Sequence, residues 1–97
     1  MSTAIKRIVK MKFRLEEIEN FKKIFSESQP FIRTFEGCQH VELLVQTDNP
    51  QIMFTLSFWD SEQNLEKYRQ SELFKTTWAK TKILFAEKPQ AWSLIKL

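Results

Sequence analysis

The alternation of apolar and polar residues predicts three strands along this chain. In residues 5–13 apolar side chains alternate with Lys10 and Lys12, so one face of the strand is apolar and the other is cationic. Residues 39–46 and 52–59 alternate in the same way, and the turn signal at residues 47–50 predicts that they form a hairpin. The second of these two stretches carries large apolar side chains on both faces, so we expect both to be covered.

A first helix is predicted by apolar residues that recur at the helical period through residues 18–32. Glu16 and Glu17 precede it and suit the positive end of a helix dipole. Pro30 is expected to bend or end this helix, because proline lacks a backbone N–H and its ring clashes with the preceding turn. Gly37, the only glycine, supplies a flexible exit toward the next strand.

A second helical region is predicted to follow the hairpin. Asp60 or Ser61 can cap its start by accepting hydrogen bonds from backbone N–H groups of the first turn. Ser71 is expected to act as a second cap that restarts the helix. Pro89 is expected to stop it, and residues 91–97 would then form the last strand.

The order of these elements, β-α-β-β-α-β, is that of a ferredoxin-like α+β domain, a four-stranded antiparallel sheet with both helices on one face. The length suits one domain, so residues 1–97 are assigned to a single domain. No predicted helix is left for the other sheet face, although the third strand presents large apolar side chains there. The same face of a second copy would cover it, and we therefore expect a homodimer with this face in the dimer interface.

Composition limits the kind of chemistry that the chain can perform. Hydrophobic residues make up 42% of it, with nine Phe and three Trp, which predicts an aromatic core. Cys38 and His40 are the only residues of their types, so neither a zinc nor a mononuclear iron site is expected. Cys38 is expected to be a small buried hydrophobic residue.

Charge and hydropathy also limit the partners. The net charge of +3 is weak support for nucleic-acid binding. Residues 52–59 contain no glycine or basic residue, unlike the base-stacking strand of RNA-binding modules with this element order. The sequence shows no charged-then-apolar leader and no apolar run approaching ~20 residues, so a cytoplasmic protein without membrane contact is expected.

Three segments carry a family resemblance. They are Phe35-Glu36-Gly37-Cys38 before the second strand, Phe58-Trp59-Asp60-Ser61-Glu62 at the end of the third, and Ser71-Glu72-Leu73-Phe74 in the helical region. With these segments nearly the whole chain resembles the antibiotic biosynthesis monooxygenase domain family, a set of dimeric ferredoxin-like proteins. That family includes quinol and polyketide oxygenases, haem-degrading enzymes and many members of unknown function, so the resemblance implies the fold more directly than an activity.

Haem degradation is disfavoured by the residues at the family's haem site. Tyr68 stands where the haem-degrading members carry a tryptophan, and Trp78 stands where they carry the histidine that ligates iron. Residues 5–13 contain no counterpart of those members' asparagine. The resemblance then implies cofactor-independent oxygenation of a small phenol or hydroquinone, in which the substrate anion itself reduces dioxygen and neither metal nor flavin is needed.

Such an enzyme requires a dry aromatic pocket, a proton acceptor and a donor for the developing oxyanion. His40 and Tyr68 are the catalytic candidates. His40 has an unperturbed pKa near neutrality, and the Tyr68 hydroxyl can donate to a substrate oxygen while its ring packs. Tyr68 also matches a position where the family's enzymes place a pocket residue. The alternatives are a partly exposed histidine beside Glu42, outside any pocket, and a buried tyrosine bonded to a backbone carbonyl.

Trp59, Trp78 and Phe74 are the candidates for binding a flat aromatic substrate, by offset stacking of the rings. The alternative is that they are simply core residues. Arg33 could hydrogen-bond a ligand at the pocket mouth, and the basic first strand, including Arg7, could hold an anionic substrate or form a solvated face. A non-catalytic dimeric binding or stress-response module that uses the same pocket is the alternative function.

Overall fold

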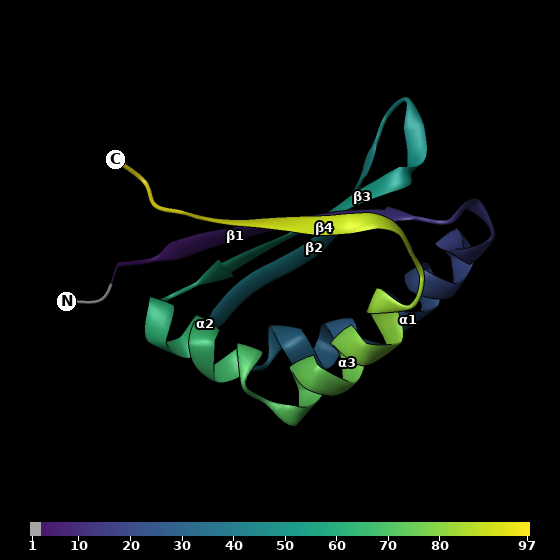
Figure 1. Ribbon diagram of the computed structural model, residues 1–97. Helices are drawn as coiled ribbons and strands as arrows, with labels where there is room; N and C mark the ends of the chain where they lie inside the picture. The colour runs from purple at the N-terminus through teal and green to yellow at the C-terminus, as the bar shows by residue number, and fades with distance from the viewer. Residues whose placement is uncertain (1–2) are drawn as a thin grey trace.

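The computed structural model describes residues 3–97 and contains one four-stranded sheet with its helices (Figure 1). The elements in chain order are β1 (Ile5–Phe13), the 3-10 turn η1 (Leu15–Glu17), α1 (Ile18–Arg33), β2 (Cys38–Gln46), β3 (Asn49–Trp59), α2 (Glu62–Arg69), α3 (Glu72–Lys82) and β4 (Phe85–Leu94). The predicted ferredoxin-like α+β fold is confirmed, with the second helical region divided into α2 and α3.

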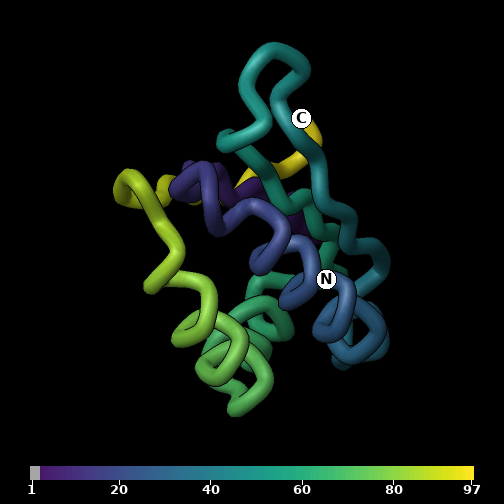
Figure 2. Tube along the Cα trace, turned by 90° about the vertical axis from the view of Figure 1, so that its right-hand side faces the viewer, coloured from purple at the N-terminus to yellow at the C-terminus, as the bar shows by residue number. Residues whose placement is uncertain are grey.

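All neighbouring strands are antiparallel, in the order β2-β3-β1-β4. The three helices lie on one side of the sheet, as Figure 1 shows. Val9 of β1 is opposite Thr55 of β3 and Ala91 of β4, and these three residues face the helices. The β2–β3 hairpin, with its turn at Thr47 and Asp48, projects beyond the rest of the sheet (Figure 2).

The other side of the sheet is called the open face, because no element of residues 3–97 covers it (Figure 1). Cross-strand pairing assembles it in rows, such as Glu42, Leu56, Ile8 and Trp92. It consists mainly of apolar side chains with two lysines, a histidine and a glutamate: Lys6, Ile8, Lys10, His40, Glu42, Leu44, Phe54, Leu56, Phe58, Trp92 and Leu94.

Serine caps divide the second helical region at the predicted places. The Ser61 hydroxyl accepts from the backbone N–H of Asn64 at 3.1 Å and begins α2, whereas Asp60 accepts from the Asn64 side chain at 2.8 Å. Ser71 accepts from the N–H of Phe74 at 3.1 Å and begins α3. The second cap therefore lies at the turn between two short helices. Tyr68 lies before this turn and Phe74 lies after it.

Neither proline ends a helix. Pro30 does not end α1, which continues to Arg33; the Ser26 carbonyl that loses its helical donor belongs to an exposed residue, so water can satisfy it. Pro89 does not stop a helix, since α3 ends at Lys82 and Pro89 lies inside β4. β4 is an edge strand, and Pro89 lies at a register shift between Glu87 and Gln90 where it has no paired residue on β1.

Gly37 occupies a conformation that only glycine adopts easily. Its φ is +86°, and a Cβ at this position would lie 2.5 Å from the Asn64 Cβ and 2.6 Å from Asp60 Oδ1. Its carbonyl also accepts from the N–H of Asp60 at 2.9 Å. Gly37 thus allows the chain that enters β2 to lie directly against the start of α2.

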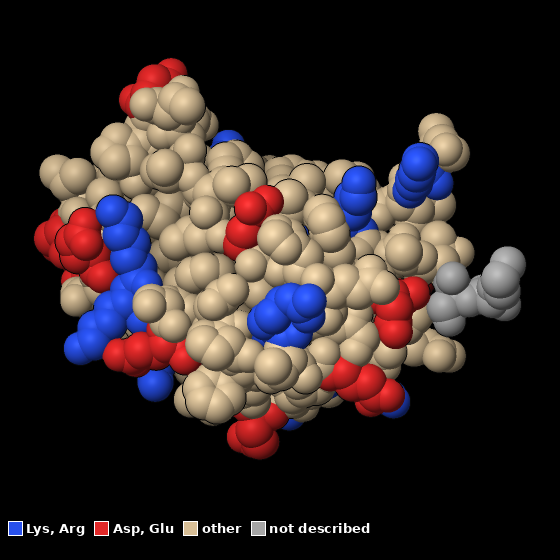
Figure 3. Space-filling model, turned by 180° about the vertical axis from the view of Figure 1, so that it is seen from behind, with Lys and Arg blue, Asp and Glu red and all other residues tan. Residues whose placement is uncertain are grey.

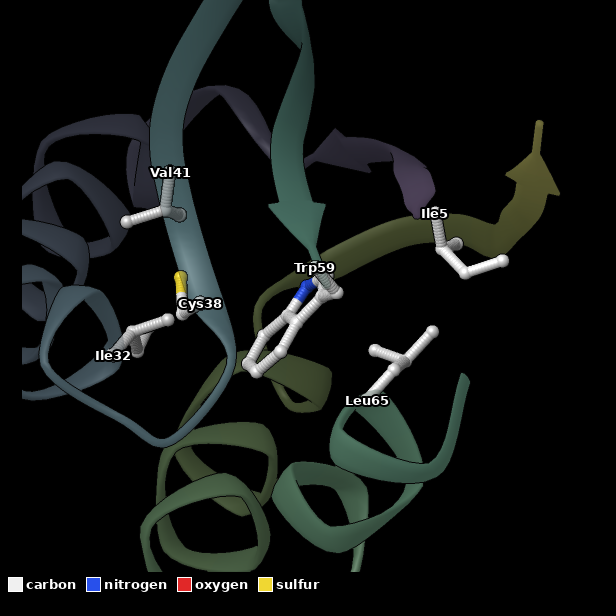
Figure 4. Close-up of a cluster of buried hydrophobic side chains, with 6 residues drawn as sticks. All are labelled: Ile5, Ile32, Cys38, Val41, Trp59 and Leu65. Carbon is white, nitrogen blue, oxygen red and sulfur yellow. The ribbon is translucent and has the colours of Figure 1, made fainter. Parts of the chain in front are cut away.

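The core consists of two clusters on the helix side of the sheet. One surrounds Phe13 and Met53, and the other surrounds Trp59, which is 0% exposed. Figure 4 shows the Trp59 ring pointing from the end of β3 toward the helices, between Cys38 on one side and Leu65 on the other. Cys38 is buried, as predicted.

The surface and the helices show two further features. Seen from behind, acidic and basic side chains are interspersed, and neither sign forms a continuous patch on the visible face (Figure 3). Within residues 3–97, no helix combines the length and the hydropathy needed to cross a membrane.

Candidate functional site

A cavity of about 340 Å³ lies between the sheet and the helices. Its volume is within the ~300–1,000 Å³ typical of small-molecule sites. β1 and β3 form its floor, α1, α2 and α3 contribute its walls, and β4 closes one side. Six aromatic side chains line it: Phe21, Phe25, Trp59, Tyr68, Phe74 and Trp78. The cavity is therefore an aromatic chamber inside the hydrophobic layer of the domain.

Four of these rings form a continuous series in contact with one another. Trp59 stacks on Tyr68 with ring centroids 5.0 Å apart, and Tyr68 meets the edge of Phe74 at 5.3 Å. Phe74 stacks almost parallel on Trp78, with centroids 5.8 Å apart and planes 9° apart. We call these four residues the aromatic array. Flat apolar walls of this kind favour a planar aromatic ligand.

Local sequence explains how the array is positioned. Phe74 and Trp78 are four residues apart on α3, so they lie on the same helix face. Trp59 ends β3, and its indole N–H donates to the Ser57 hydroxyl at 2.9 Å, which holds the buried ring in place. Tyr68 lies in the last turn of α2, just before the Ser71 cap redirects the chain.

The hydroxyl of Tyr68 is available to a ligand. Among residues 3–97 it has no hydrogen-bond partner, and no fully buried side-chain oxygen in that range lacks one. The oxygen is therefore not fully buried, and Tyr68 is one of the residues that line the cavity. Burial raises the pKa of Tyr68 well above its ordinary value, so the hydroxyl stays protonated and acts as a donor.

The other polar groups of the cavity are mostly engaged within the chain. Ser28 donates to the Ile24 carbonyl at 2.9 Å, and Thr81 donates to the Thr77 carbonyl at 2.8 Å. No aspartate, glutamate or histidine of residues 3–97 lines the cavity. The described part of the site thus provides hydrogen-bond donors but no ordinary proton acceptor.

Two arginines also line the cavity. Arg7 extends from β1 on the helix-facing side and donates to the Ser93 hydroxyl at 3.0 Å. Arg69 extends from the end of α2 and pairs with Glu66 at 3.1 Å. Sequence reasoning grouped Arg7 with the other cations of its strand, but Lys10 lies on the open face. Arg7 is two residues from Val9, and alternate residues of a strand lie on the same face. This spacing was the signal that distinguished Arg7 from the lysines of its strand, whereas no local pattern singled out Arg69.

The structure gathers four of the six predicted site residues around the cavity and leaves two outside it. Trp59, Tyr68, Phe74 and Trp78 are the four that line it. His40 lies on the open face, where its Nε2 is 3.5 Å from Glu42 Oε2 and its ring lies 5.0 Å from the ring of Phe58. Arg33 donates to the Cys38 carbonyl at 2.8 Å and holds the chain at the start of β2.

Comparison with known proteins gives a family match and many similar folds. Residues 4–80 match the family model described as antibiotic biosynthesis monooxygenase. No curated protein matches the chain. A conserved protein from Methanosarcina mazei Go1 is 20% identical with a TM-score of 0.94, and the match covers 98% of this chain and 94% of that one.

Two further solved structures illustrate the breadth of the fold. The protein Rv0793 from Mycobacterium tuberculosis is 16% identical with a TM-score of 0.90, covering 98% of this chain and 96% of that one. SnoaB, a cofactor-independent oxygenase from Streptomyces nogalater, is 10% identical with a TM-score of 0.87, covering 98% and 94%. At these identities the likeness to the solved structures shows a common fold.

Proposed function

Because the chain belongs to the antibiotic biosynthesis monooxygenase family, we propose that its cavity binds a small phenol or hydroquinone and oxidises it with dioxygen. The reaction inserts one oxygen atom of dioxygen into the substrate as a quinone carbonyl and releases the other as water. The ionised substrate supplies the electrons, so the proposal includes no bound cofactor. In this proposal the protein contributes a dry chamber, a fixed orientation of the ring and a hydrogen bond to the reacting oxygen.

The observation that supports this function best is the aromatic array around a free hydroxyl. In the proposed complex Trp59, Phe74 and Trp78 enclose the substrate ring, and Tyr68 donates to the oxygen on which negative charge develops. A preorganised donor of this kind is worth about 10²–10³ in rate. His40 and Arg33 have no part in the proposal, since both lie outside the cavity.

Oxygen consumption tests the reaction directly. Purified protein would be supplied with a panel of hydroquinones and anthrones in an oxygen electrode, with quinone formation followed by absorbance. We expect at least one compound to be consumed with one dioxygen per molecule oxidised. If no member of the panel accelerates oxygen uptake over the buffer rate, the enzymatic proposal fails.

The second candidate is a non-catalytic binding or stress-response module, and one observation favours it. Neither a carboxylate nor an imidazole of residues 3–97 lines the cavity, so a proton-abstracting residue is missing from the described site. The two functions predict different results for the Tyr68→Phe variant. Loss of turnover with retained binding supports the oxygenase, whereas a change in affinity alone, without any turnover in the wild type, supports the binding module.

We further propose that the chain is a cytoplasmic homodimer that uses the open face as its interface. Support comes from apolar side chains that stay accessible in one copy: Leu44 is 44% exposed, Trp92 43% and Leu94 46%. Around them the residues of β3, such as Leu56 and Phe58, are only partly covered by their neighbours. Large contiguous apolar patches on a monomer mark interaction sites. Analytical ultracentrifugation tests the proposal, and a monomer at micromolar concentration would contradict it.

A further inference from the structure

Two guanidinium groups approach the cavity from different elements. Arg7 lies near the start of β1, and Arg69 is the last residue of α2. Arg7 is partly buried between the sheet and the helices, while the side chain of Arg69 is 46% exposed. Among residues 3–97 they are the two charged residues that line the cavity. Tyr68 lines the same cavity as the two arginines.

The charge at this place is not balanced within the chain. Arg7 hydrogen-bonds to Ser93, which is neutral, and Arg69 pairs with Glu66. Among residues 3–97, Glu66 is the one carboxylate that forms an ion pair with either arginine, and Gln70 also donates to it at 2.9 Å. Two cations facing one carboxylate leave about one positive charge beside an aromatic wall, and this charge attracts an anion.

We propose that Arg7 and Arg69 form an anion-recognition site in the cavity, so that its ligand is a flat aromatic molecule bearing an ionised oxygen, either a phenolate or a carboxylate. The inference rests on the proposed function in that it assumes an aromatic ligand in the cavity. It adds the residues that select the ionised form of that ligand. Guanidinium groups bind such oxygens with charge-assisted hydrogen bonds, which are stronger than neutral ones.

The site also compensates for the missing proton acceptor. A nearby positive charge favours the ionised form of an acidic group, so a bound phenol loses its proton to water more readily than a free phenol does. Burial lowers the pKa of Arg7 most, and repulsion from the charge of Arg69 lowers it further. An anionic ligand between them relieves that repulsion.

Equilibrium dialysis of three probes of similar size tests the inference. The probes are 4-nitrophenol at a pH where it is ionised, 4-nitrobenzoate, and the neutral 4-nitrotoluene. In Arg7→Gln and Arg69→Gln we expect the affinity for the ionised probes to fall about tenfold each, as for loss of one charge-assisted hydrogen bond. Affinity for 4-nitrotoluene should stay within about twofold. Lys75→Gln removes the same charge from an exposed position on α3 and should change none of the three.

A gain-of-affinity variant separates recognition from damage to the fold. Glu66→Gln removes the one counter-charge, so both anions should bind about threefold more tightly, a result that unfolding cannot produce. The two anionic probes also tell whether a phenolate or a carboxylate is preferred. Binding of 4-nitrotoluene as tight as that of the anions, or equal losses for all three probes in the arginine variants, would overturn the anion site and leave the aromatic cavity standing. Failure of all three to bind the wild-type protein would sink both proposals.

Discussion

The ring of Tyr68 stacks on the ring of Trp59, with centroids 5.0 Å apart and planes inclined by 27°. Trp59 is fully buried and its indole N–H donates to Ser57, so it provides a fixed surface for its neighbour. Phe35 and Phe74 each form a T-shaped pair with Tyr68, with ring centroids 5.5 Å and 5.3 Å apart. Three aromatic neighbours restrict the Tyr68 ring and thereby the position of its hydroxyl.

Removal of that hydroxyl should impair oxidation without disturbing the fold. In Tyr68→Phe we expect kcat/KM for the best phenolic substrate to fall about a hundredfold, because a positioned donor to the developing oxyanion is lost. Substrate affinity should change little, since the ring and its three aromatic contacts remain. Oxygen-electrode kinetics measure the first effect and dialysis the second. Tyr68→Leu, which removes the ring as well, should lose affinity too. Wild-type turnover by the phenylalanine variant would refute the assigned role.

Tyr68 should also make stability sensitive to alkaline pH. Its pKa in the folded protein lies above the ordinary value of 10.0, because burial disfavours the tyrosinate. The unfolded chain therefore releases this proton first as the pH rises. The stabilisation is fully present below about pH 10 and is lost from there toward the folded-state pKa, at up to about 1.4 kcal/mol per pH unit. Urea unfolding between about pH 9 and about pH 11 checks this. Tyr68→Phe should show a shallower decline over that interval, and parallel curves would contradict the prediction.

Gly37→Ala should destabilise the domain by about 2 kcal/mol or more. At a φ of +86° an alanine is in a left-handed conformation that is unfavourable for a residue with a Cβ. That Cβ would also lie 2.5 Å from the Asn64 Cβ. The midpoint of urea unfolding at an unchanged slope measures the loss. The same substitution in an Asn64→Gly background removes the nearest clash and should recover part of the difference. If Gly37→Ala unfolds at the wild-type urea concentration, the close approach of the β2 entry to α2 is wrong.

A charge on the open face should prevent dimerisation. Leu56 of β3 is opposite Glu42 of β2 on one side and Ile8 of β1 on the other. Leu56→Lys therefore places an ammonium at the centre of the proposed interface. We expect the dimer dissociation constant to rise at least about a hundredfold, as for an unpaired charge in an apolar contact. Sedimentation velocity over a concentration series measures it. Lys75→Gln, on the helix side, is the matched control and should associate like the wild type. An unaltered dimer in Leu56→Lys would place the interface elsewhere.

The elements of this fold were largely predictable, because their signals are local. Strand alternation and helix caps depend on residues within a few positions of each other, and Ser61 and Ser71 cap α2 and α3 as expected. The errors came from the two prolines. Their effect depends on whether the missing N–H had a partner to lose, and this is known only once the neighbours in space are known. For Pro89 the decisive fact is that β4 is an edge strand.

The candidate site was predictable only in part. The sequence by itself determined that Tyr68, Phe74 and Trp78 lie on the buried side of their helices, since their spacing after the caps assigns them to that side, and it left the strand face of Trp59 open. Tertiary structure decided what they surround. The strand register places His40 on the open face and Arg7 at the cavity. A shift of one residue along a strand would reverse the face on which each side chain lies. Arg69 joined Arg7 through the packing of a helix on a distant strand, a relationship that no local pattern encodes.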